Sequence, residues 1–216
     1  MPFDLTIIEP DSPEFPAGLR DMTLWTTSPK IWTIGNRKIL GRPLVGFFCS
    51  IRCPGNIILG TYDLVRILRD ANVGVIGGFH SPIEKDCLDL LLRGSQPVVI
   101  CPARSIEHMR IRTEYRQSLD EGRLLFLSPF NKSQRRPTVK TSHYRNLFVA
   151  ALSAVAFVAH AGPDSKTESL CREILSWRKS IYTFDSDYNK NLLDIGAKPI
   201  KPENLSGWAK FLAMYK

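Results

Sequence analysis

Cysteine pairs, long apolar runs and an amino-terminal signal are all missing from this sequence. Its five cysteines are odd in number and form no C-x-x-C pair, which argues against a disulfide framework and a zinc site. The longest apolar stretch, Leu147–Ala161, is too short to span a bilayer. The first residues include Pro2 and Asp4 rather than a basic region followed by an apolar run, so no secretory signal is indicated. These absences predict a cytoplasmic protein with no bound metal and no membrane segment.

Acidic side chains are in deficit. The 21 aspartates and glutamates are outnumbered by 29 lysines and arginines, which gives a net charge of +8 and a pI of about 9.4. This balance favours a polyanionic partner such as nucleic acid. Much of the excess lies in one stretch of the chain: Arg104, Arg110, Arg112, Arg116, Arg123, Lys132, Arg135, Arg136, Lys140 and Arg145.

Short apolar runs alternate with segments of helical period along most of the chain. We expect strands at 44–48, 73–76, 97–101, 124–127, 155–159 and, as the last one, 180–184. The segments between them are expected to be helical, including 61–70, 113–121, 144–152 and 168–177, whereas the basic stretch 131–141 is expected to be a loop. This alternation predicts an α/β fold: a Rossmann-like doubly wound, mostly parallel sheet with helices on both faces.

The chain of 216 residues is long enough for one domain with a sizeable core. Residues 1–43 are punctuated by prolines and are expected to form an extended lead-in, with a strand or two, packed on the main domain. Residues 44–200 would form the Rossmann-like domain. Residues 201–216 would add a carboxyl-terminal helix, Leu205–Tyr215, that docks on the body or on a second subunit.

Two glycine-bearing segments, 45–55 and 73–81, stand where neighbouring strands should end. Because ligands of doubly wound sheets bind beyond the carboxyl ends of the strands, we expect these two turns to meet there with exposed backbone N–H groups. The collection favours an anion, above all phosphate. The residues that the turns contribute are Ser50 and Arg52 from the first, and Gly77, Gly78, His80 and Ser81 from the second.

Each of these signals also has a plainer interpretation. Arg52 could be a surface arginine paired with an acid such as Glu84, and the glycine pair could provide only a tight turn with positive φ. Arg145 and Asn146 open the helix expected at 144–152, where a positive charge opposes the helix dipole. An arginine in that position points to an external anion.

A series of motifs follows the order of motifs in a known family. Ser50-Ile51-Arg52 stands where that family has a glycine-serine-arginine turn, and 77–84 stands where it has serine-glycine-x-alanine-x-glycine-isoleucine-aspartate. Tyr144-Arg145-Asn146 matches its arginine-asparagine helix. The segments 15–19, 28–36, 165–167 and 191–197 match further landmarks. Over about residues 12–200 the chain therefore resembles the Rossmann-type module of the DNA-processing protein A family (DprA, also called Smf). The chain departs from the family at four positions. Glu84 replaces the family's aspartate and Leu88 its histidine, while Leu147 replaces an arginine and His160 an acidic residue.

The resemblance implies a function and a set of residues. It implies a protein that binds single-stranded DNA in a basic pocket at the carboxyl edge of the sheet, loads a recombinase during transformation and forms a homodimer, with no enzymatic step and no cofactor. The residues that would hold backbone phosphates are Ser50, Arg52, Gly77, Gly78 and Arg145. A basic residue of 110–116, such as Arg110 or Arg112, would replace the family's pocket lysine. His80, Ser81 and Asn146 complete the candidate site.

Two other functions stay open at this point. The wider group that includes DprA also contains the Lonely Guy nucleotide hydrolases, whose arginine helix and glycine-rich turn ending in glutamate are similar to Arg145-Asn146 and 162–168. In that case Arg145 and Glu168 would be the catalytic residues of a nucleoside-monophosphate phosphoribohydrolase. A sensor of a small nucleotide would use the same pocket without turnover.

Overall fold

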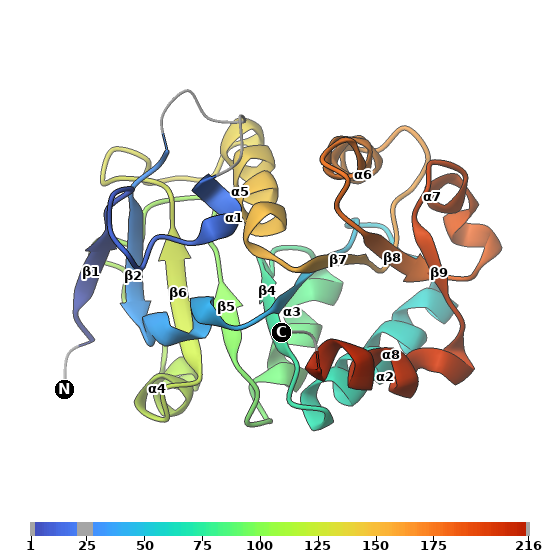
Figure 1. Ribbon diagram of the computed structural model, residues 1–216, viewed down its shortest axis with the longest axis horizontal. Helices are drawn as coiled ribbons and strands as arrows, with labels where there is room; N and C mark the ends of the chain where they lie inside the picture. Colours follow the sequence, from blue (N-terminus) through green and yellow to red (C-terminus); the bar gives the residue numbers. More distant parts are fainter. Residues whose placement is uncertain (1–2, 21–27, 215–216) are drawn as a thin grey trace.

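A single sheet of nine strands runs through the part of the chain that the computed structural model describes, residues 3–20 and 28–214 (Figure 1). Its strand order is β1-β2-β6-β5-β4-β3-β7-β8-β9. The strands are β1 (Leu5–Ile8), β2 (Ile31–Gly35), β3 (Leu44–Phe48), β4 (Gly74–Gly77), β5 (Val98–Ile100), β6 (Leu124–Ser128), β7 (Val155–Val158), β8 (Ile181–Phe184) and β9 (Lys198–Ile200). The seven neighbouring strands β6-β5-β4-β3-β7-β8-β9 pair in parallel. β2 pairs with β6 in antiparallel register.

Helices follow most of the parallel strands and cover both faces of the sheet (Figure 1). The α-helices are α1 (Ala17–Arg20), α2 (Gly55–Asp70), α3 (Pro82–Leu91), α4 (Thr113–Asp120), α5 (Val139–Leu152), α6 (Lys166–Ser176), α7 (Lys190–Asp194) and α8 (Leu205–Ala213). Short 3-10 helices lie at η1 (Arg37–Gly41), η2 (Asp187–Asn189) and η3 (Pro202–Asn204). The expected Rossmann-like α/β fold is confirmed.

The alternation of side chains along each strand builds two hydrophobic cores. On β3, Val45 and Phe47 pack with α2, α3 and α8, whereas Leu44 and Phe48 pack with α1, α5 and α6 on the other face. Because every residue of β3 is buried, the strand reads as a continuous apolar run, as expected for a parallel strand covered on both faces. The sheet is therefore a rigid platform, and its loop-bearing edges are where side chains are free to bind a ligand.

Several boundaries differ from the sequence prediction. β9 follows β8, so Ile181–Phe184 is not the last strand, because a three-residue edge strand that contains Pro199 gives little periodic signal. α5 begins at Val139 instead of residue 144, so the end of the predicted loop 131–141 is helical. The prediction missed the capping pair at this start, in which Thr138 and Thr141 exchange side-chain-to-backbone hydrogen bonds. The predicted helix end at Tyr215 lies outside the described residues.

Side-chain hydrogen bonds satisfy backbone groups at the ends of α3 and α5. Ser81 and Glu84 form a capping box at the start of α3, with Pro82 in its first turn. At the carboxyl-terminal end of α5, the Lys179 ammonium donates hydrogen bonds to the carbonyl oxygens of Ala150, Ala151 and Ser153. Since the last carbonyls of a helix have no partner inside it, this lysine satisfies groups that would otherwise be buried unpaired.

In the described part of the chain, no helix has both the length and the apolar character that crossing a bilayer requires.

Candidate functional site

The two predicted turns lie side by side because the strands that carry them are neighbours. β3 and β4 pair in parallel, with Phe47 opposite Gly77. One carboxylate then joins the turns: Glu84 Oε1 accepts a hydrogen bond from the Cys49 N–H at 3.0 Å, and Oε2 accepts from the N–H groups of His80 at 2.7 Å and Ser81 at 3.1 Å. Glu84 is 8% exposed. It therefore acts as an internal anion that holds the ends of two strands together.

This arrangement corrects one part of the sequence prediction. The backbone N–H groups of Cys49, His80 and Ser81 are not available to an external phosphate, because Glu84 already binds them. The Ser50 N–H is used as well, since it donates to the His160 carbonyl at 2.9 Å. An anion at this edge must therefore be held largely by side chains. Arg52 is a surface residue, as the plainer interpretation has it, but it forms no ion pair with Glu84.

The glycine pair serves close approach rather than a left-handed backbone. Neither glycine has positive φ; the residue with positive φ in this turn is Phe79, at 45°. A Cβ atom on Gly78 would overlap the guanidinium of Arg145. Gly78 is thus the residue that lets the guanidinium of α5 lie against the turn after β4.

Arg145 is a buried cation at this position. Only 4% of the surface of Arg145 is exposed to solvent. Its Nη1 donates a hydrogen bond to the Cys101 carbonyl at 2.9 Å, and its Nε donates one to Asn146 Oδ1 at 2.8 Å. No carboxylate forms an ion pair with it among residues 3–20 and 28–214. Because a buried charge is costly unless it is paired, this geometry favours an external anion as its partner. Arg145 lies well inside α5, so the helix-dipole argument made from the sequence does not apply.

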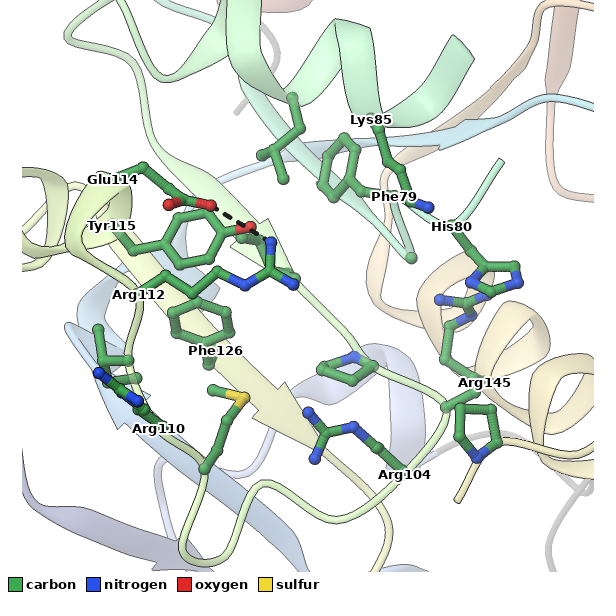
Figure 2. Close-up of a pocket in the computed structure, with 18 of the residues that line it drawn as sticks. Phe79, His80, Lys85, Arg104, Arg110, Arg112, Glu114, Tyr115, Phe126 and Arg145 are labelled. Carbon is green, nitrogen blue, oxygen red and sulfur yellow. Dashed lines mark hydrogen bonds and ion pairs between the residues drawn. The ribbon is translucent and has the colours of Figure 1, made fainter. Parts of the chain in front are cut away.

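Arg145 forms part of the wall of a pocket of about 440 Å³, which we call the edge pocket. The pocket lies beyond the carboxyl ends of β4, β5 and β6 and opens between the loops that follow them (Figure 2). Its basic lining residues are Lys85, Arg104, Arg110, Arg112 and Arg145, against the carboxylates of Asp89 and Glu114. Arg112 and Glu114 form an ion pair in which Arg112 Nη1 lies 3.4 Å from Glu114 Oε1. The balance of charge in the pocket is positive.

An aromatic and apolar wall lies among these arginines. Tyr115 and Phe126 pack edge to face with their centroids 5.3 Å apart, and Phe79 and Met109 line the same pocket. Figure 2 shows Arg112, Glu114 and Tyr115 on one side of the opening and His80 and Arg145 on the other. Burial, together with the charge of Glu114, raises the pKa of Tyr115 above its ordinary value, so the phenol stays neutral. The pocket thus combines a flat apolar surface with cations, as nucleotide sites do.

The structure brings half of the predicted site residues together. Gly78, His80, Arg110, Arg112 and Arg145 line the edge pocket, whereas Ser50, Arg52, Gly77, Ser81 and Asn146 are not among its lining residues. Arg104 and Lys85 also line the edge pocket but were not predicted as site residues. Arg104 closely follows the end of β5, and because ligands bind beyond the carboxyl ends of parallel strands, its position could have identified it.

Ser50 and Arg52 stand at the edge of the site, on the turn after β3. The Ser50 hydroxyl is buried and has no hydrogen-bond partner within the described part of the chain. Arg52 is exposed and forms no ion pair with any described residue. Their roles in binding phosphate stay a prediction.

Comparison with known proteins places the chain in a family. The family model described as DNA recombination-mediator protein A matches residues 6–204, which is nearly the whole chain. The chain belongs to this family. No curated protein matches it significantly.

Solved structures show the same fold as this member of the DNA recombination-mediator protein A family. DNA processing protein A (DprA) from Streptococcus pneumoniae aligns with a TM-score of 0.78 and 16% identity, covering 98% of this chain and 75% of the other. DprA from Helicobacter pylori, for which a unique single-stranded DNA binding mode is described, aligns with a TM-score of 0.75 and 19% identity, covering 97% and 96%. The molybdenum cofactor carrier protein from Chlamydomonas reinhardtii is more distant, with a TM-score of 0.55 and 11% identity, covering 81% and 100%.

Glu168, the catalytic residue of the alternative hydrolase, has a structural role in this family member. Its Oε2 accepts from the Asp164 N–H at 2.6 Å, and its Oε1 accepts from Arg172 Nη2 at 2.8 Å. Glu168 lies in the first turn of α6, which Ser165 caps, and it does not line the edge pocket that contains Arg145. The placement of Glu168 therefore does not support the hypothesis that Arg145 and Glu168 act together as the catalytic residues of a hydrolase. No group of histidine, cysteine or acidic side chains suited to a metal ion occurs in residues 3–20 and 28–214.

Proposed function

We propose that this protein binds single-stranded DNA in the edge pocket and acts as a DNA-processing recombination mediator. The observation that carries the proposal is Arg145, a buried guanidinium without a carboxylate partner in the described structure, held at the wall of a pocket with four more cations. Membership of the family and the fold shared with the Helicobacter pylori protein support the same conclusion.

The walls of the pocket favour a single strand over a duplex. Tyr115, which is half-buried, presents a flat apolar surface that a base can contact only when it is unstacked and unpaired. A pocket of about 440 Å³ is the size of a small-molecule site, so it accommodates a nucleotide and not a double helix. The arginines at its rim would then bind the phosphates on each side of that nucleotide.

The rest of the proposal follows the family. We propose that the protein works in the cytoplasm as a homodimer, on DNA taken up during transformation, and that it delivers this DNA to a recombinase. Ser50, Arg52, Gly77, Ser81 and Asn146 are proposed to contact the strand where it continues past the pocket, along the turns after β3 and β4 and along α5.

Fluorescence anisotropy with a labelled single strand and with a duplex of the same sequence tests the proposal. We expect tighter binding of the single strand, because only unpaired bases reach the aromatic wall. We also expect a slope of log affinity against log salt of about −2 to −3, since each neutralised phosphate of a single strand contributes about −0.7.

Absence of binding at low salt would refute the proposal. Equal affinity for both forms would mean that the aromatic wall contacts no base. Thermal stabilisation by a mononucleotide, without binding of any oligonucleotide, would replace the proposal with a nucleotide sensor that uses the same cations.

A further inference from the structure

A second hollow adjoins the edge pocket and shares one arginine with it. This hollow, which we call the side pocket, has a volume of about 380 Å³. It lies between the loop after β5 and the loop after β6, and its lining residues are Arg104, Ser105, Glu107, His108, Lys132 and Arg135. Arg104 lines both pockets, so the two lie next to each other.

Hydrogen bonds between the two loops hold the walls of the side pocket in place. The Ser105 N–H donates to the Gln134 carbonyl at 2.7 Å, and the Ser128 hydroxyl donates to the Arg104 carbonyl at 2.8 Å. The Glu107 N–H donates to the Ser105 hydroxyl at 3.1 Å. Because both loops are anchored at the ends of adjacent strands, the side pocket is prepared before any ligand arrives.

The side pocket is basic, and its cations are not neutralised by the protein. Arg104, Lys132 and Arg135 form no ion pair with any residue of 3–20 and 28–214. Glu107 is the single carboxylate that lines the pocket, which leaves an excess of positive charge. His108 has a left-handed backbone, with φ at 58°, a conformation that is uncommon for a residue other than glycine. Strain of this kind is concentrated at functional sites.

We propose that the side pocket is a second phosphate subsite for the same DNA strand. The inference rests on the proposed function and deepens it. The nucleotide in the edge pocket places one flanking phosphate at Arg104, and the strand continues so that the next phosphates lie against Lys132 and Arg135. Contacts to phosphate carry no sequence information, so the subsite increases affinity for longer strands of any sequence.

A double variant, Lys132→Ala with Arg135→Ala, tests the subsite by anisotropy with thymidine oligonucleotides of roughly three and roughly twelve nucleotides. Both residues are exposed, so the fold is preserved. We expect affinity for the longer strand to fall roughly tenfold at low salt and its salt slope to shrink by about 1.4, which corresponds to two phosphates. Affinity for the short oligonucleotide should stay within about twofold, because it fits in the edge pocket alone.

The matched control removes two cations from the opposite edge of the sheet. Lys38 and Arg42 are exposed residues just before β3, and neither side chain has a hydrogen-bond or ion-pair partner among the described residues. If Lys132→Ala with Arg135→Ala changes binding of the longer strand no more than Lys38→Ala with Arg42→Ala does, the subsite is refuted while the proposed function stands. Equal losses for short and long oligonucleotides would also refute a separate subsite. If the unmodified protein binds neither oligonucleotide, the proposed function fails first.

Discussion

Replacing Arg145 with methionine is expected to weaken binding of single-stranded DNA at least about 100-fold, which corresponds to about 3 kcal/mol. The guanidinium is fixed by the Cys101 carbonyl and by Asn146, so it reaches a phosphate without having to be ordered first. Methionine has similar length and fills the space beside Gly78 without charge. Anisotropy measures the loss of affinity, and thermal unfolding measures the effect on stability.

Stability should move differently from binding in this variant. A buried cation without a carboxylate partner destabilises the free protein, so Arg145→Met is expected to leave the melting temperature unchanged or to raise it. Arg116→Met is the control, because Arg116 is exposed and does not line the edge pocket. It should change affinity less than about twofold. A variant at Arg145 that binds DNA normally would contradict the proposed role of the edge pocket.

Replacing Glu84 with glutamine is expected to lower the free energy of unfolding by about 3 kcal/mol or more. The carboxylate accepts three backbone hydrogen bonds from the turns after β3 and β4, and a glutamine NH₂ group cannot accept any. At least one buried N–H would then face another donor. Urea unfolding at neutral pH measures the loss.

The control for this variant comes from the same helix. Asp89→Asn also removes one negative charge from α3, but Asp89 is exposed, so the change in stability should stay within about 0.5 kcal/mol. If Glu84→Gln costs less than about 1 kcal/mol, the carboxylate does not hold the two turns together. The backbone N–H groups of Cys49, His80 and Ser81 would then be available to phosphate, as the sequence alone suggested.

The alternation of apolar strands and amphipathic helices was enough to predict the fold, because a parallel strand such as Leu44–Phe48 must be buried on both faces. The capping box at Ser81 and Glu84 was only half visible. The residues Ser81-Pro82-Ile83-Glu84 are typical of a capped helix start, but nothing in this pattern indicates that Glu84 also accepts a hydrogen bond from the Cys49 amide. Contacts between strands depend on the order of strands in the sheet, which local patterns do not encode.

The candidate site was predicted in part for a similar reason. Arg110, Arg112 and Arg145 belong to different segments of the chain, and the resemblance to a family identified them where spacing could not. Arg104 and Phe126 carried no motif, and only the neighbouring positions of β5 and β6 bring them to the same pocket. The role of Gly78 also depends on a contact with a distant helix, so the sequence suggested a turn where the structure shows a close approach.

Photochemical cross-linking of the unmodified protein to a single strand that carries 5-iodouracil, followed by mapping of the cross-linked peptides, tests the central claim most directly. The edge pocket predicts cross-links to Tyr115, which lines it and is half-buried, whereas Phe79 and Phe126 are buried. Cross-links confined to other surfaces, such as the segment around η1 at the opposite edge of the sheet, would show that DNA binds elsewhere and would contradict the account.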